Sequence, residues 1–219
     1  MPELTDETRS ILHRVGLGLV VFGLIDVGVM VYCITNGLSY SSSFNIFAVI
    51  SGVYLWRGHP WYVKWVTRAA GFYAAAFCTM VPIAPLLFPV DLGALELRLH
   101  PGGVIFGTAA TIGAVVFLIW AYRELRQAPV LAAYSVAGHS PEPFWVSPLC
   151  GVALALGVGV LFIVLMHGDT EQRVIGLASV KTGPGYHYFV THLSYAGGRG
   201  TAEVLAYDDR TIKTVEVKW

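Results

Sequence analysis

The sequence predicts an α-helical membrane bundle of five transmembrane helices, followed by a small antiparallel β-sheet domain outside the membrane. Hydrophobic residues make up 55% of the chain and charged residues only 13%, which is far from the composition of an ordinary soluble domain. Five apolar stretches within residues 11–167 are each about long enough to cross a bilayer. The C-terminal segment is more polar and has the alternation and turn residues that are typical of strands.

The five predicted spans follow one another with short polar connections. Their bounds are Ile11 to Thr35, Leu38 to Trp56, Trp65 to Phe88, Gly102 to Tyr122 and Val146 to His167. We expect the first span to be a retained anchor, because its apolar run is longer than that of a signal peptide. The predicted domains are therefore a transmembrane domain, residues 1–167, and an extramembrane β-rich domain, residues 168–219.

Basic residues near the span ends predict how the chain is oriented. Between and before the spans, one face collects Arg9, Arg14, Arg57, Lys64, Arg68, Arg123 and Arg126. The opposite face has only Arg98 between its spans. Cytoplasmic segments concentrate lysine and arginine, so we expect a cytoplasmic N-terminus and an extracytoplasmic C-terminus. Tryptophans at the same span ends, typical of an interfacial aromatic belt, agree with this orientation: Trp56, Trp61, Trp65, Trp120 and Trp145.

The acidic residue nearest to mid-membrane is Asp26, in the first predicted span. A charged carboxylate at that depth costs several kcal/mol unless it is neutralised or paired. Hydroxyl groups on neighbouring spans are the expected hydrogen-bond partners: Ser51, Thr79, Thr108 and Thr111. The pattern leaves two roles open for Asp26, a link between helices and a station in a proton or ion relay.

Gly103 and Gly107 form a GxxxG pattern that Thr111 continues on the same face of the fourth span. Small residues at this spacing let helix backbones approach closely. The expected contact is between helices of one chain, and a homodimer seam is the alternative. The sequence leaves the oligomeric state undetermined.

Several histidines and one aspartate are candidate ligands for a metal ion or haem. We expect no cofactor. His100, His167 and Asp169 fall on the outer side and are the weak candidates for a metal or haem site. His13 and His59 are a second, similarly weak pair at the inner side.

No serine–histidine–acid or paired-carboxylate pattern is visible, so we assign no catalytic residue and expect no enzyme. The 14 basic and 14 acidic residues balance. Nucleic acid is therefore not an expected partner, since binding it requires a basic surface.

The C-terminal segment reads as four strands in an antiparallel meander. They are Val174 to Val180, Tyr186 to Tyr195, Thr201 to Tyr207 and Ile212 to Trp219, separated by segments rich in turn-forming residues. The outer loop from Asp91 to His100 is expected to form a short strand or an interfacial turn. Its leucines have two expected locations, packed against the extramembrane β-rich domain or in the layer of lipid headgroups.

The end of the chain also resembles a known family. The stretch from Thr191 to Trp219, which contains SYAGGRGTAEVLAYDDRTIKTVEVKW, is similar to the closing hairpin of the cytochrome oxidase complex assembly protein one domain. Gly197, Gly198, Gly200, Ala202 and Val204 match its turn and strand. The chain departs from the family at Thr211 and Ile212, where tryptophan is usual, in having no evident helix before the sheet, and in its four extra spans.

This resemblance implies a non-enzymatic factor that contacts respiratory-oxidase subunits, or another membrane complex, through residues 173–219. The front spans, with SYSSSFNIFAVISGVYLWRG, resemble uncharacterised bacterial membrane proteins, which implies a multi-pass protein of the bacterial plasma (inner) membrane. Two alternatives remain open: a small transporter or ion conductor that uses Asp26, and a membrane protein that binds haem or a metal.

Overall fold

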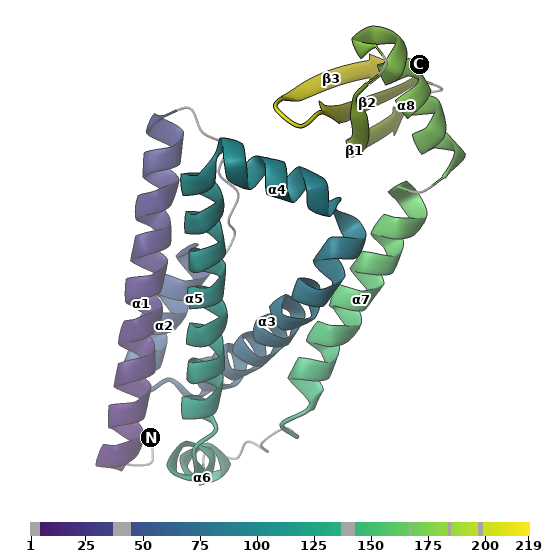
Figure 1. Cartoon of the computed structure of the whole chain (residues 1–219). Helices are drawn as coiled ribbons and strands as arrows, with labels where there is room; N and C mark the ends of the chain where they lie inside the picture. The colour runs from purple at the N-terminus through teal and green to yellow at the C-terminus, as the bar shows by residue number, and fades with distance from the viewer. Residues whose placement is uncertain (1–4, 37–44, 137–142, 167, 184, 197–198) are drawn as a thin grey trace. The chain divides into compact units, whose positions relative to one another are not determined.

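The computed structural model describes residues 5–36, 45–136, 143–166, 168–183, 185–196 and 199–219. Helices dominate these residues, and three strands form one sheet near the C-terminus (Figure 1). The helices are α1 (Asp6–Thr35), α2 (Asn45–Trp56), α3 (Pro60–Leu87), α4 (Val90–Leu99), α5 (Pro101–Leu125), α6 (Ala128–Val136), α7 (Val146–Met166) and α8 (Asp169–Thr182). The strands are β1 (His187–Ala196), β2 (Arg199–Tyr207) and β3 (Ile212–Lys218).

Four helices of the described part are long and apolar enough to cross a membrane. They cover Asp6–Thr35, Trp61–Leu87, Pro101–Leu125 and Val146–Val164, and they confirm four of the predicted spans. The remaining span is not confirmed, because α2 has 12 residues and is only about 18 Å long, against about 30 Å of hydrocarbon. The first part of that predicted span, residues 38–44, lies outside the described residues.

The chain forms two compact units. The first contains Met1–Ala76 and Gly113–Val152, and the second contains Phe77–Ile112 and Ala153–Trp219. Helices α3, α5 and α7 each contribute one part to each unit. All of residues 168–219 belong to the second unit, which also contains α4.

In the first unit, α1 and α2 pack against each other in antiparallel directions (Figure 1). They cross where two glycines meet. A Cβ atom built on Gly16 would lie 2.7 Å from the carbonyl oxygen of Gly52, and one built on Gly52 would lie 2.6 Å from that of Gly16. Nearer the start of α1, the rings of His13 and Trp56 meet edge to face with centroids 4.9 Å apart. The C-terminal end of α2 therefore lies at the level of the first turns of α1.

One end of the first unit gathers three segments that are distant in the sequence. The Thr8 hydroxyl donates a hydrogen bond to the carbonyl oxygen of Pro129 at 3.2 Å, and Arg14 lies 3.7 Å from Glu124. A buried apolar cluster joins the same region and includes Ile11, Leu12, Val15, Val63, Val66, Leu125 and Val130. The N-terminus, the start of α3 and the end of α5 thus meet. The basic residues that predict a cytoplasmic face lie in these same three segments.

The second unit holds the sheet, whose strand order is β1-β2-β3 with both pairs antiparallel. This confirms the predicted meander for its last three strands. The predicted strand from Val174 to Val180 is wrong, because these residues lie in α8. Its apolar run suits either structure, but Val174 and Ala178 are four residues apart and bury one helical face against the sheet. Tertiary packing here outweighs the β propensity of valine.

Helix α4 replaces the predicted strand or turn between Asp91 and His100. Leu92 and Leu95, three residues apart, face the same side of a helix and are both buried. Asp91 in the first turn and Arg98 in the last turn each complement the helix dipole. Leucines and charged residues alternate at the end of this segment with the two-residue period of a strand. That period predicted the wrong secondary structure.

The turn between β2 and β3 is held by the side chain of Asp208. Its Oδ1 atom accepts hydrogen bonds from the backbone N–H groups of Arg210, at 2.8 Å, and Thr211, at 2.7 Å. These bonds, together with the Thr211 hydroxyl, lower the pKa of Asp208 below its usual value. The stabilisation is present above the usual aspartate pKa and is lost as the pH falls through the lowered value.

Candidate functional site

The three-stranded sheet is covered on one face by α8. Val174 and Ala178 pack against Val190, Val204 and Val217, and all five side chains are at most 1% exposed. Figure 1 shows α8 alongside the strands. Because successive strand residues point to opposite faces, these valines define the α8 face of the sheet.

Helix α4 covers part of the opposite face. Leu92 and Leu95 form a buried cluster with Tyr207, and partly buried side chains surround it: Phe189, Leu205 and Ile212. Burial raises the pKa of Tyr207, and the nearby charge of Asp91 raises it further. The packing of α4 against the sheet, one of the two expected locations for its leucines, is confirmed.

The rest of this second face is exposed and polar. We define the open half-face as His192, Ser194, Glu203, Thr214, Glu216 and Lys218, all of which are exposed. The strand register places His192 opposite Glu203 and Glu203 opposite Glu216, so one row of polar side chains crosses all three strands. The sheet therefore has an apolar half covered by α4 and an adjoining polar half that the described chain leaves uncovered.

The charges in the open half-face are not arranged for stability. Glu203 and Glu216 are direct cross-strand neighbours, and like charges in that relation destabilise a sheet. Lys218 lies 3.0 Å from Glu216, but an exposed ion pair contributes only about 0–1 kcal/mol. Two carboxylates held side by side at the surface suit a partner that presents basic groups.

A bulge in β1 changes where two histidines point. An unbroken strand would place His187 and His192 on opposite faces, but the register shifts between Val190 and His192. His187 pairs with Tyr207 and His192 with Glu203, so both lie on the face that α4 partly covers. They remain about four residues apart along the neighbouring strand, roughly 13 Å, which is too far for one metal ion.

The outer metal candidates are only partly described. His100 is the C-cap residue of α4 and is exposed. His167 lies outside the described residues, and of Asp169 only the backbone is described. In the part of the chain that the structure describes, no group of three or more histidine, cysteine, aspartate or glutamate side chains is placed to hold a metal ion.

Asp26 lies half-buried in α1 and takes part in an interaction within the protein. Of its four expected hydroxyl partners, Ser51 belongs to the same unit. Thr111 instead donates its hydroxyl to the carbonyl oxygen of Gly107 in its own helix, at 2.9 Å. Both roles given to Asp26 from the sequence therefore stay predictions.

The GxxxG glycines lie on α5 without close neighbours. A Cβ atom built on Gly103 or Gly107 would have no other atom within 4 Å. Their role in packing stays a prediction, in either its intramolecular or its dimeric form.

Close helix contacts occur instead at glycines that the sequence analysis did not identify. Gly16 meets Gly52, Gly71 lies against the ring of Tyr122, and Gly151 lies against the backbone of Phe72. The sequence does contain a signal for the close contact at Gly16. This glycine lies on the apolar face of α1, whose other buried residues include Ile11, Leu12, Val15 and Leu19. At Gly16 the buried stripe coincides with a close helix contact, whereas the GxxxG spacing of Gly103 and Gly107 does not.

A scan against protein-family models finds no matching family, and searches of curated proteins and of solved structures find no similar protein. The class of the protein therefore follows from the structure alone. Four apolar helices of membrane-spanning length, joined to a small helix-and-sheet module, place the chain among multi-pass membrane proteins.

Proposed function

We propose that the protein is a non-enzymatic interaction or assembly factor of the bacterial plasma membrane. Its extramembrane domain binds a subunit of another membrane complex, and the family resemblance favours a respiratory oxidase. The open half-face carries this proposal. It is a polar, exposed surface on a domain whose two apolar surfaces are already covered by α8 and α4.

The arrangement before the sheet adds support to the resemblance. A preceding helix belongs to the pattern of the assembly-protein domain, and its apparent absence was one of the departures noted from the sequence. Helix α8 ends at Thr182 and β1 begins at His187, so a helix does precede the sheet. The departures at Thr211 and Ile212, and the additional spans, remain.

Co-purification tests the proposed interaction. An N-terminally tagged copy, expressed near its native level and purified from native membranes in mild detergent, is expected to retain specific partner subunits that mass spectrometry identifies. Charge reversal by Glu203→Lys together with Glu216→Lys is expected to lower their recovery at least tenfold, because it replaces the paired carboxylates with repelling charges.

The matched control is Asp209→Lys, which reverses an exposed charge in the turn between β2 and β3, outside the open half-face. It is expected to leave partner recovery unchanged. Equal recovery with all variants, or a wild-type protein that purifies without any specific partner, would contradict the proposal.

We further propose that the N-terminus is cytoplasmic and the C-terminus extracytoplasmic, with five crossings. Two observations support this path. The chain returns to the level of His13 by the end of α2, and the three basic segments meet at one end of the first unit. Alkaline phosphatase fused after Trp219 is expected to be active, and a cytoplasmic reporter such as green fluorescent protein inactive, at that position. The reverse pattern would refute this orientation.

A further inference from the structure

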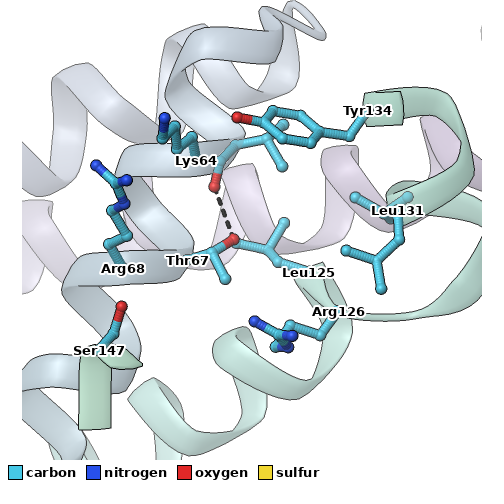
Figure 2. Close-up of a pocket in the computed structure, with 10 residues that line it drawn as sticks. Lys64, Thr67, Arg68, Leu125, Arg126, Leu131, Tyr134 and Ser147 are labelled. Atoms are coloured by element: carbon cyan, nitrogen blue, oxygen red, sulfur yellow. Dashed lines mark hydrogen bonds between the residues drawn. The ribbon is translucent and has the colours of Figure 1, made fainter. Parts of the chain in front are cut away.

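A hollow lies in the first unit where α3, α5, α6 and the start of α7 meet (Figure 2). The space between its lining atoms is about 470 Å³, a figure that includes open solvent at the mouth of the hollow. Its polar lining consists of Lys64, Thr67, Arg68, Arg126, Tyr134 and Ser147. Its apolar wall comes from buried side chains of the same elements, among them Leu125 and Val130.

Three cationic side chains reach this hollow from two directions. Lys64 and Arg68 are four residues apart on α3 and therefore project from the same face of the helix. Arg126 follows the end of α5. All three are half-buried, so their charges are less screened than those of fully exposed residues. No acidic residue is among the described residues that line the hollow.

Aromatic rings hold the two arginines in place. The guanidinium of Arg68 lies 5.6 Å from the centre of the Trp65 ring, and that of Arg126 lies 5.6 Å from the centre of the Tyr122 ring. The Tyr122 hydroxyl donates a hydrogen bond to the carbonyl oxygen of Phe144, which ties α5 to the segment before α7. Such stacking restricts the arginine side chains, whose planar guanidinium groups match the geometry of phosphate oxygens.

Hydroxyl groups complete the lining. The Tyr134 side chain is buried, which raises the pKa of its phenol, while the positive charge of Arg68 acts in the opposite direction. The phenol therefore remains a neutral donor near a cation. Ser147 offers a second hydroxyl from the start of α7. Several donors and several positive charges around one space match the oxygen atoms of a phosphate group.

The neighbouring tryptophans indicate the depth of the hollow relative to a bilayer. Trp61 and Trp65 on α3 and Trp145 before α7 are about half exposed, at 52%, 49% and 54%. Tryptophan prefers the headgroup layer, and these residues lie at the ends of helices that are apolar enough to span. The hollow therefore lies at the level where phospholipid headgroups are found.

We propose that this hollow binds the phosphodiester headgroup of an anionic phospholipid. Lys64, Arg68 and Arg126 bind the phosphate charge, and the hydroxyls of Tyr134 and Ser147 donate to its oxygens. The acyl chains then extend along the apolar surfaces of the spanning helices. Basic pockets between membrane helices on the cytoplasmic side are suited to this type of ligand.

Native mass spectrometry of the full-length protein in detergent tests the site, with phosphatidylglycerol and the net-neutral phosphatidylcholine as added lipids. Wild-type protein is expected to bind phosphatidylglycerol more tightly. Lys64→Gln and Arg126→Gln are each expected to weaken phosphatidylglycerol binding about fivefold, the effect of removing one cation near an anionic lipid.

Two controls make the outcome decisive. Arg123→Gln removes an exposed charge near Arg126 that does not line the hollow, and Lys64→Arg keeps the charge within it. Arg123→Gln is expected to bind phosphatidylglycerol as wild type does, and Lys64→Arg is expected to bind it more tightly than Lys64→Gln does. Equal binding by all variants would overturn the proposal. If inorganic phosphate displaces phosphatidylglycerol at a comparable concentration, the proposal of a lipid ligand is wrong and the hollow binds free phosphate.

Discussion

Gly16→Leu is expected to separate α1 from α2 and to destabilise the first unit by about 3 kcal/mol or more. Overpacking a well-packed core typically costs about 1–3 kcal/mol, and the cost is highest when the neighbour cannot move. Here the neighbour is backbone. A Cβ atom at position 16 would lie 2.7 Å from the carbonyl oxygen of Gly52 and 2.9 Å from the backbone nitrogen of Trp56. No change of rotamer relieves either contact.

The measurement is the thermal unfolding temperature of the full-length protein in detergent, and Gly28→Leu is the matched control. Gly28 lies on the same helix, and a Cβ atom there would have no neighbour within 4 Å. Leucine also favours helix more than glycine by nearly 1 kcal/mol, so the control is expected to be neutral or slightly stabilising. Equal destabilisation by the two variants would show that α1 and α2 do not cross at Gly16.

Val204→Asp is expected to unfold the sheet and α8 while leaving the four long apolar helices folded. Val204 is fully buried at the centre of the cluster between the sheet and α8. A carboxylate there would be desolvated without a described cationic neighbour in that cluster, which costs several kcal/mol. A domain with so small a core has little stability to lose.

Limited proteolysis of the full-length protein in detergent measures this effect. The variant is expected to lose its C-terminal segment rapidly and to leave a protected fragment that contains the spans. Thr214→Asp is the control, because it also replaces a β-branched residue with aspartate but at an exposed position in β3. If the tail of Val204→Asp resists proteolysis as well as that of the control, the cluster does not hold the domain together.

The long spans and the last three strands could be predicted from the sequence because their signals are local. An apolar run of about 20 residues, or alternation bounded by turn residues, needs no knowledge of neighbours. Helix α8 could not be distinguished from a strand in this way. Its buried residues, Val174 and Ala178, are defined only by contact with the sheet. The same applies to α4, whose helical face is set by Tyr207.

The hollow shows a different limit of sequence analysis. Lys64, Arg68 and Arg126 were all recognised from the sequence as basic residues of one face. Their meeting around one space depends on how α3 packs against α5 and α6, which periodicity does not specify. Conversely, the GxxxG pattern of Gly103 and Gly107 was visible in the sequence, yet the described structure places its close contacts at other glycines.

The contact between α4 and the sheet has a consequence for how the protein is made. Leu92 and Leu95 leave the ribosome about half a chain before Tyr207, the residue that buries them. During synthesis Leu92 and Leu95 therefore stay uncovered until α7, α8 and the strands have been made and the sheet has folded against α4. Formation of this small cluster therefore requires that α5 and α7, the two long helices between α4 and the sheet, bring the ends of this segment together. A chain that stops early, or inserts one helix wrongly, keeps an exposed apolar helix that proteases and chaperones recognise.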